Sequence, residues 1–178
     1  MSRRIWTFSP PTRCVIGTVG LPGERTFYLQ VSDETAIVSL RIEKQQADLL
    51  ASRILEILAE VGLPTSTSTA SDADAGPLTT PVEEDFSVGA IGLAWDPQSQ
   101  SVIIEAHDEQ AAEAAELGDD DDEAGDTVRV FLSVDQAAAF CARTKSVVAA
   151  GRPPCPLCGL VLEPTGHICP RANGYRRR

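Results

Sequence analysis

The sequence predicts an α+β fold in which two β-β-β-α units form a mainly antiparallel sheet with two helices on one face. Short segments of branched and aromatic residues, separated by turns, indicate strands, and two longer segments with apolar residues at three- and four-residue steps indicate helices. The two strand-to-helix passages also match at a fixed offset of ninety, which indicates an internal duplication. The matching pairs are Gln46 with Gln136, Ala47 with Ala137, Leu50 with Phe140, and Arg53 with Arg143. The alternative is a chance likeness between two amphipathic helices.

The first unit is predicted to span residues 1–63. Its helix begins near Lys44, and Gly62 and Pro64 end it, because these two residue types interrupt helical geometry. Four strands are expected before the helix, at Ile5–Phe8, Cys14–Val19, Thr26–Val31 and Ala36–Ile42. Residues 64–85 are rich in Ser, Thr, Ala and Asp, and we expect them to form a flexible linker.

The second unit is predicted to span residues 86–151. Ser133 and Gln136 have the spacing of a capping box, which marks the start of a helix that Gly151 ends. Three strands are expected before this helix, at Ser87–Trp95, Ser101–His107 and Thr127–Leu132. Residues 108–126 interrupt the unit with a dense run of carboxylates. Because like charges this close repel one another, we expect this acidic insertion to be a disordered, solvated loop.

Residues 152–178 are predicted to form a small zinc knuckle followed by a basic tail. Three thiols and one imidazole lie within one short segment, which is the Cys₃His ligand set of a closed structural zinc site. The four expected ligands are Cys155, Cys158, His167 and Cys169. Pro156 and Gly159 shape the first turn, because proline restricts φ and glycine lets the backbone curl around a thiolate.

Other interpretations of the cysteines remain open at this stage. The pair Cys155 and Cys158 has the spacing of a redox dithiol, although the chain leaves no room after it for the βαβ unit that such chemistry uses. A disulfide or unliganded thiols are further alternatives. His167 and Cys169 are only two residues apart, so they must sit in a turn to bind one ion. Otherwise Cys141, or His107, would replace one of them.

The net charge of −11 is unevenly distributed along the chain. Residues 64–128 contain seventeen acidic side chains and no Lys or Arg, whereas residues 129–178 contain eight basic and two acidic side chains. Charges act locally, within about 8 Å at physiological salt. The acidic middle therefore opposes nonspecific binding to nucleic acid, while the basic end favours contact with an anionic partner.

The sequence contains few residues that suggest catalysis or a membrane. It has two histidines, no glycine-rich phosphate loop and no nucleophile elbow. A zinc ion with four protein ligands would have no position for a reactive water. No apolar run approaches the ~20 residues of a membrane span, and no secretion signal is evident at the start. We expect a cytoplasmic protein with no membrane contact, and we lean against an enzyme.

A set of C-terminal residues resembles a known signature. It comprises Arg152 to Gly159, Pro164, Gly166, His167, Cys169, Pro170, Arg171, Asn173, Gly174 and Tyr175. These residues resemble the end of an uncharacterised actinobacterial family, domain of unknown function 3090. The strand around Leu29 and the helix from Lys44 are similar to the family's N-terminal half. The resemblance implies no established activity. Its members tend to be encoded near a histidine-phosphatase-like and a kinase-like protein, which implies a shared pathway.

Three functions follow as hypotheses. The preferred one is a zinc-binding, non-catalytic interaction or regulatory module that contacts a protein partner through its knuckle. The second is a single-stranded nucleic-acid binder that uses phosphate contacts and stacking. The third is an enzyme with a site at the junction of the two units. The residues expected to contact a partner or nucleic acid are Arg171, Tyr175, Arg176, Arg177 and Arg178.

Overall fold

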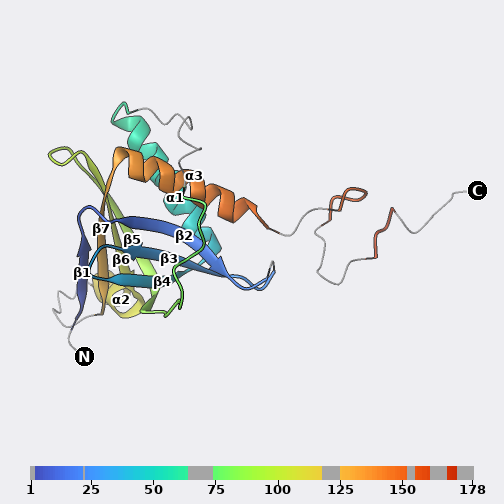
Figure 1. The fold of residues 1–178 in the computed structure, drawn as a ribbon, viewed down its shortest axis with the longest axis horizontal. Coiled ribbons are helices and arrows are strands. Elements are labelled where there is room, and N and C mark those ends of the chain that lie inside the picture. Colours follow the sequence, from blue (N-terminus) through green and yellow to red (C-terminus); the bar gives the residue numbers. More distant parts are fainter. Residues whose placement is uncertain are drawn as a thin grey trace, which may run out of the picture.

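Seven strands form one mostly antiparallel sheet, and helices pack around it, in a computed structural model of the chain (Figure 1). The structure describes residues 3–21, 23–63, 74–117, 125–151, 155–160 and 168–171. The strands are β1 (Ile5–Phe8), β2 (Arg13–Val19), β3 (Thr26–Ser32), β4 (Ile37–Ile42), β5 (Phe86–Asp96), β6 (Ser101–Asp108) and β7 (Thr127–Ser133). The helices are α1 (Lys44–Glu60), α2 (Glu109–Leu117) and α3 (Val134–Ala149).

The sheet consists of two antiparallel halves joined edge to edge. Its order is β1-β7-β6-β5-β4-β3-β2, so β2, β3 and β4 form one half and β5, β6 and β7 most of the other. The halves meet where Leu40 and Arg41 of β4 pair in parallel with Phe86 and Ser87 of β5. This junction is short, and the strands of the two halves run in clearly different directions (Figure 1).

Helices α1 and α3 lie side by side and share one hydrophobic core with the sheet. Ile54 of α1 is fully buried, as are Leu29 and Leu40 of one half and Ile104 of the other. Burial of apolar surface at this single core is the main stabilising contribution. The predicted α+β class, with a mainly antiparallel sheet and two packed helices, is therefore confirmed.

Both of these helices begin where the sequence predicts, and for the same physical reason. The side chain of Gln46 accepts a hydrogen bond from the backbone N–H of Glu43 at 2.9 Å, and Gln136 does the same for Ser133 at 3.1 Å. Each helix thus starts with a capping box, which satisfies N–H groups that have no partner within the helix.

The first strand is not part of the half to which the sequence analysis assigned it. β1 pairs in parallel with β7, in the register Ile5 opposite Thr127 and Phe8 opposite Val130. Arg4 supports this pairing, because its backbone N–H donates to Asp126 at 2.9 Å and its guanidinium donates to the same carboxylate. β1 therefore lies at the edge of the second half of the sheet, whereas the prediction placed it in the N-terminal unit.

The expected flexible linker, residues 64–85, contains a packed segment. Residues 64–73 lie outside the described residues. Residues 74–79, here called the strap, pack on the first half of the sheet: Leu78 is buried against Gly17, where a side chain would collide with it. Thr79 donates its N–H to Gln30 at 2.8 Å, and Gln30 returns a bond to the Thr79 carbonyl at 3.0 Å. The described part of this segment is thus a packed element.

The acidic insertion, residues 108–126, begins as a helix and not as a disordered loop. Glu109–Leu117 form α2, which packs against β5 and β6. Asp108 holds both ends of the insertion, because its carboxylate accepts from Ala111 N at 2.7 Å and from Asp126 N at 2.9 Å. A carboxylate at a helix N-terminus is favourable there. Residues 118–124, with most of the acidic run, lie outside the described residues.

In the part of the chain that the structure describes, no helix is long and apolar enough to cross a membrane.

Candidate metal centre and a surface groove

Three cysteines meet in the short segment that follows α3. The sulfur atoms of Cys155, Cys158 and Cys169 all lie within 4.8 Å of one another, and those of Cys155 and Cys169 are 3.8 Å apart. Cys155 and Cys169 are buried although the segment is small, with 6% and 8% of their surfaces exposed. Two residues that are adjacent in space but fourteen apart in sequence therefore present their thiols to one point.

The backbone around Cys155 is arranged to support a thiolate. Leu157 directs its N–H to the Cys155 sulfur at 3.4 Å. The backbone of Cys155 accepts a hydrogen bond from Gly159 N at 2.9 Å and donates one to the Leu160 carbonyl at 2.7 Å. Gly159 has a φ of +76°, which glycine adopts without strain. Amide donors from Cys158 and Leu157 lower the pKa of Cys155 below its ordinary value. Such a thiol is a good metal ligand, because metals bind the thiolate.

The geometry fits a tetrahedral metal better than a disulfide. Zinc–sulfur bonds of ~2.3 Å at tetrahedral angles separate neighbouring sulfur atoms by about 3.8 Å, which matches the distance between Cys155 and Cys169. A disulfide would bring the two sulfur atoms to ~2.05 Å, much closer than the distance found between Cys155 and Cys169. Three of the four predicted ligands are thus brought together in a form that can hold a metal ion.

Of the other predicted site residues, Arg171 alone is among the described residues. His167, the fourth predicted ligand, lies outside the described residues, as do Tyr175, Arg176, Arg177 and Arg178. Arg171 is described, and its guanidinium donates to the Leu157 carbonyl at 3.0 Å. This bond ties the second part of the cysteine segment to the first. Arg171 therefore has a structural contact within the segment, beyond the partner contact that was predicted.

Neither proposed substitute ligand lies in the cluster. Cys141 is buried between α3 and α1, where its thiol donates to the Ala51 carbonyl at 3.4 Å, and burial raises its pKa to about 12. His107 lies at the end of β6 and bonds to the Thr127 hydroxyl at 3.2 Å. Neither residue belongs to the cluster of Cys155, Cys158 and Cys169.

Comparison with known proteins places the chain in a family. The family model described as "Protein of unknown function (DUF3090)" matches residues 6–169, which include the sheet, the helices and all three clustered cysteines. The chain belongs to this family. No curated protein and no solved structure matches the chain.

In this DUF3090 chain, large apolar side chains surround the cysteines and face solvent. Leu157 is 52% exposed, Leu160 is 55% exposed and Ile168 is 83% exposed. Contiguous apolar patches mark interaction sites, so these three side chains are the candidate contact surface of the segment. The sequence analysis did not identify these residues, although their position between the cysteines was visible in the sequence.

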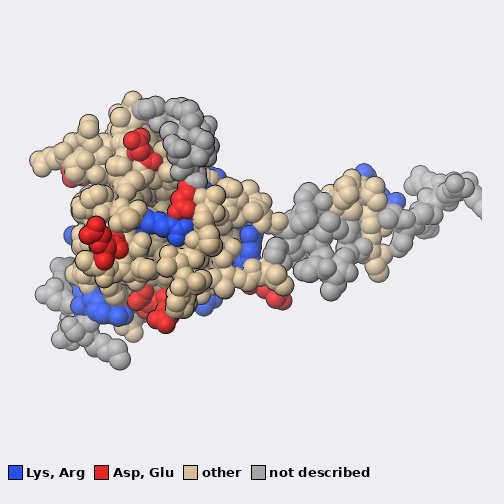
Figure 2. Space-filling model, in the orientation of Figure 1, with Lys and Arg blue, Asp and Glu red and all other residues tan. Residues whose placement is uncertain are grey.

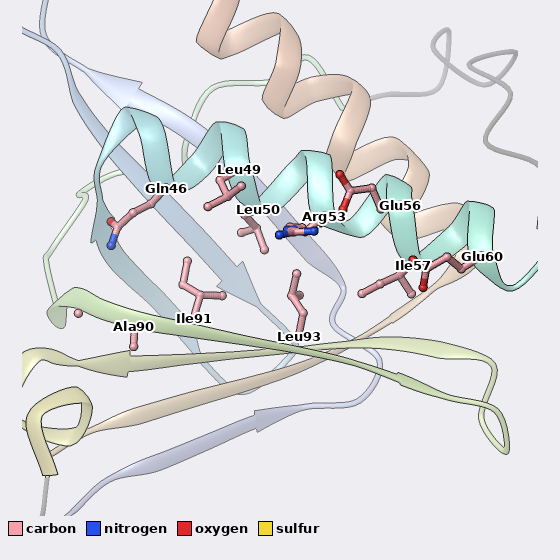
Figure 3. Close-up of a pocket in the computed structure, with 11 residues that line it drawn as sticks. Gln46, Leu49, Leu50, Arg53, Glu56, Ile57, Glu60, Ala90, Ile91 and Leu93 are labelled. Carbon is pink, nitrogen blue, oxygen red and sulfur yellow. Dashed lines mark hydrogen bonds and ion pairs between the residues drawn. The ribbon is translucent and has the colours of Figure 1, made fainter. Parts of the chain in front are cut away.

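A groove between α1 and β5 is a second candidate site, at the junction of the two predicted units, and sequence analysis identified none of its lining residues as site residues (Figure 3). It has a volume of about 500 Å³. Leu49 and Arg53 line it from the helix, and Ile91 and Leu93 rise toward them from the strand. The offset between Arg53 and Arg143 was evident from the sequence, but nothing in the sequence indicated that only one of the two would line an open groove.

Proposed function

We propose that this protein is a zinc-binding, non-catalytic interaction module that contacts a protein partner through its C-terminal knuckle. The observation that carries the proposal is the convergence of Cys155, Cys158 and Cys169 on one point. Zinc is the metal that a sulfur-rich, four-ligand site of this size suits best, and His167 is the proposed fourth ligand. With four protein ligands, the ion would hold the segment in shape without binding a reactive water.

A protein partner is supported by the surface of the knuckle. Leu157, Leu160 and Ile168 expose apolar side chains around the cysteines. Burial of their remaining exposed surface in a contact would be favourable, by less than the ~1.5–3 kcal/mol that full burial of such a side chain contributes. On the face shown in Figure 2, acidic and basic side chains of the sheet domain are interspersed and form no broad basic patch. Nucleic-acid binding proteins usually carry such a patch, so the apolar knuckle surface favours a protein.

Metal analysis of the purified full-length protein tests the zinc site. Protein prepared without added zinc is expected to contain one zinc ion per chain, and Cys158→Ala and His167→Ala are each expected to lose most of it. Cys141→Ala is the matched control, because this thiol is buried between the helices, and it is expected to keep its metal. Protein without metal, or Cys158→Ala protein with full metal content, would contradict the assignment.

Capture from a lysate of the source organism tests the partner. We expect the intact chain to retain a protein after nuclease treatment, and Ile168→Ser to lose it. Leu21→Ser is the control, since Leu21 is 71% exposed in a turn of the sheet domain, and it is expected to retain the partner. Retained material that disappears on nuclease treatment would instead favour the nucleic-acid alternative.

A further inference from the structure

The groove between α1 and β5, here the α1–β5 groove, has a counterpart between α3 and β2, here the α3–β2 groove. Both are lined by a helix and by the first strand of the other half of the sheet. The helix residues correspond at an offset of ninety and the strand residues at an offset of seventy-seven. The pairs are Gln46 and Gln136, Leu49 and Ala139, Leu50 and Phe140, Arg53 and Arg143, Gly89 and Thr12, Ala90 and Arg13, and Ile91 and Cys14.

A hydrogen bond from helix to strand is repeated in the two grooves. Gln46 donates its side-chain N–H to the Val88 carbonyl at 3.3 Å, and Gln136 donates to the Pro11 carbonyl at 2.9 Å. Val88 and Pro11 are again seventy-seven positions apart. The correspondence therefore extends from the lining residues to the contact that positions each helix on its strand.

The α3–β2 groove is occupied by the chain itself. Arg143 is only 8% exposed, and it donates to the Ile16 carbonyl on the edge of β2 at 2.8 Å and to the Gly76 carbonyl of the strap at 2.8 Å. A third bond reaches the Asp74 carbonyl. Arg13 pairs with the Asp74 carboxylate. An arginine thus joins the edge of a strand to the backbone of an extended segment, and only about 130 Å³ of the groove is left.

The α1–β5 groove has the same construction, but none of the residues that the structure describes crosses it as the strap crosses the other groove. Arg53 has a 63% exposed side chain that pairs with Glu56 at 2.7 Å, and Leu49 is 59% exposed. β4 pairs with β5 only at Phe86 and Ser87, so the edge of β5 from Val88 onward has no strand partner in the described chain. Open strand edges of this kind accept an extended peptide through main-chain hydrogen bonds.

The charges of the two grooves differ in a way that selects the occupant. Ala90 takes the position that Arg13 has in the α3–β2 groove. An acidic side chain of a segment bound in the α1–β5 groove would therefore meet no cation at that position. Glu56 and Glu60 line its far end, at the positions that Ser146 and Ala150 hold on α3. A basic side chain of a bound segment would therefore be stabilised there.

We propose that the α1–β5 groove binds an extended peptide segment of a partner protein, with Arg53 donating to its backbone carbonyls and Glu56 and Glu60 receiving a Lys or Arg side chain. This site is separate from the knuckle. The strap shows how such a segment lies in a groove of this construction, with small side chains on the peptide where it passes the arginine. Gly76 and Ala75 are the strap residues at that point.

Titration of ¹⁵N-labelled full-length protein with two short peptides, followed by NMR, tests the proposal. One peptide is Lys-Ala-Gly-Pro-Leu-Lys, whose core copies the strap and which brings an amine to the glutamates in either chain direction. The other is Asp-Ala-Gly-Pro-Leu-Asp. We expect the lysine peptide to shift the amide signals of Leu49, Arg53, Ala90 and Ile91. At low salt its affinity should exceed that of the aspartate peptide by at least about threefold, because exposed charge pairs contribute modestly.

Substitutions in the groove distinguish the contribution of Arg53 from that of the two glutamates. Arg53→Ala is expected to weaken binding of the lysine peptide about fivefold or more through the lost carbonyl contacts. The double change Glu56→Gln and Glu60→Gln is expected to remove the preference for lysine. Arg41→Ala, an exposed arginine outside the groove, is the matched control and is expected to bind normally.

Two results would overturn the proposal. One is the absence of shifts in the groove with either peptide at millimolar concentration. The other is an equal response in Arg53→Ala protein. Cys158→Ala is expected to bind the peptide as the intact protein does, so failure of the knuckle assignment and failure of the groove assignment are distinguishable.

Discussion

Arg53 and Arg143 occupy equivalent places on two helices and yet have opposite environments. Arg53 faces solvent in an open groove, whereas Arg143 is buried and satisfies three backbone carbonyls. Burial lowers the pKa of the Arg143 guanidinium below its ordinary value, and the nearby Asp74 carboxylate offsets only part of this shift. Sequence matching could pair the two residues but could not reveal this difference, because the strap that buries Arg143 comes from a distant part of the chain.

We expect this difference to appear directly in stability. Arg143→Ala should lower the free energy of unfolding by about 2–3 kcal/mol, because it leaves buried carbonyls without donors. Arg53→Ala should change it by less than about 0.5 kcal/mol, as is usual at exposed positions. Urea unfolding of both variants checks the prediction, and equal effects of the two changes would contradict it.

Asp74 is expected to make part of the stability depend on pH. A hydrogen bond from Arg13 lowers the pKa of Asp74 below its ordinary value, which is ~3.9. The ion pair therefore stabilises the fold above about pH 4, and the contribution is lost as the pH falls through the lowered pKa. Because Asp74 is 41% exposed, the contribution should be below about 1 kcal/mol.

Comparison of the intact protein with Asp74→Asn isolates this contribution. The intact protein should be the more stable of the two at pH 6, and the difference should shrink below about pH 4. Denaturant midpoints at a series of pH values measure it. A difference in stability that grew as the pH fell would contradict the prediction that the ionised Asp74 carboxylate stabilises the fold.

Among the elements, the helix starts were the most predictable and the strand partners the least. Ser133 and Gln136 identified the start of α3 because a capping box acts within four residues. The parallel pairing of β1 with β7 depends on contacts such as Arg4 with Asp126, which are 122 residues apart, and no local pattern reports it. Helix α2 was missed because the acidic run that follows it dominated the interpretation of the insertion.

Gln136 links the start of α3 to the segment before β2, so its substitution tests how much these contacts stabilise the protein. It caps α3 and also donates to the Pro11 carbonyl at 2.9 Å. Gln136→Ala should lower the free energy of unfolding by about 1–2 kcal/mol, since both the cap and this second bond are lost. Gln45→Ala, at an exposed position of α1, is the control and should have little effect. Thermal or urea unfolding measures both.

At the cysteine segment, the sequence predicted the ligand types and spacing, but not the surface around them. Spacing alone indicated that Cys155 and Cys158 act together, because a two-residue turn brings both thiols to one side. The exposure of Leu157 and Ile168 depends on which way the turn faces, and this cannot be derived from spacing. The zinc ion and His167 as its ligand stay predictions.

In the whole molecule, the two halves are interlocked in a reciprocal manner. α1 packs against β5 of the second half, and α3 packs against β2 of the first. Where the helices cross, Cys141 contacts Ala51, and these two positions are ninety apart, like the pairs matched in the sequence. Equivalent residues meet in this way when two units are related by a twofold axis. The contact supports the predicted duplication, which stays a prediction.

Removal of the metal is expected to affect the knuckle and leave the sheet intact. The hydrophobic core extends from Trp6 to Val148, and none of residues 155–160 and 168–171 belongs to it. Treatment with a chelator should therefore shift the thermal midpoint of the sheet domain by less than about 2 °C, since a larger shift would need a change near 1 kcal/mol. Calorimetry measures it. A drop of ten degrees or more would show that the bound metal stabilises the sheet domain.

The pairing of β1 with β7 has a consequence for the protein as it is synthesised. Ile5–Phe8 leave the ribosome long before their partner strand, which begins at Thr127. At about 5–20 residues per second, the first strand waits on the order of 6–25 s before any partner exists. During that time its backbone groups are open to other nascent chains. Ribosome-bound chains that stop before residue 127 should therefore leave the amides of Ile5–Phe8 unprotected from hydrogen exchange, whereas chains with all of β7 outside the exit tunnel should protect them.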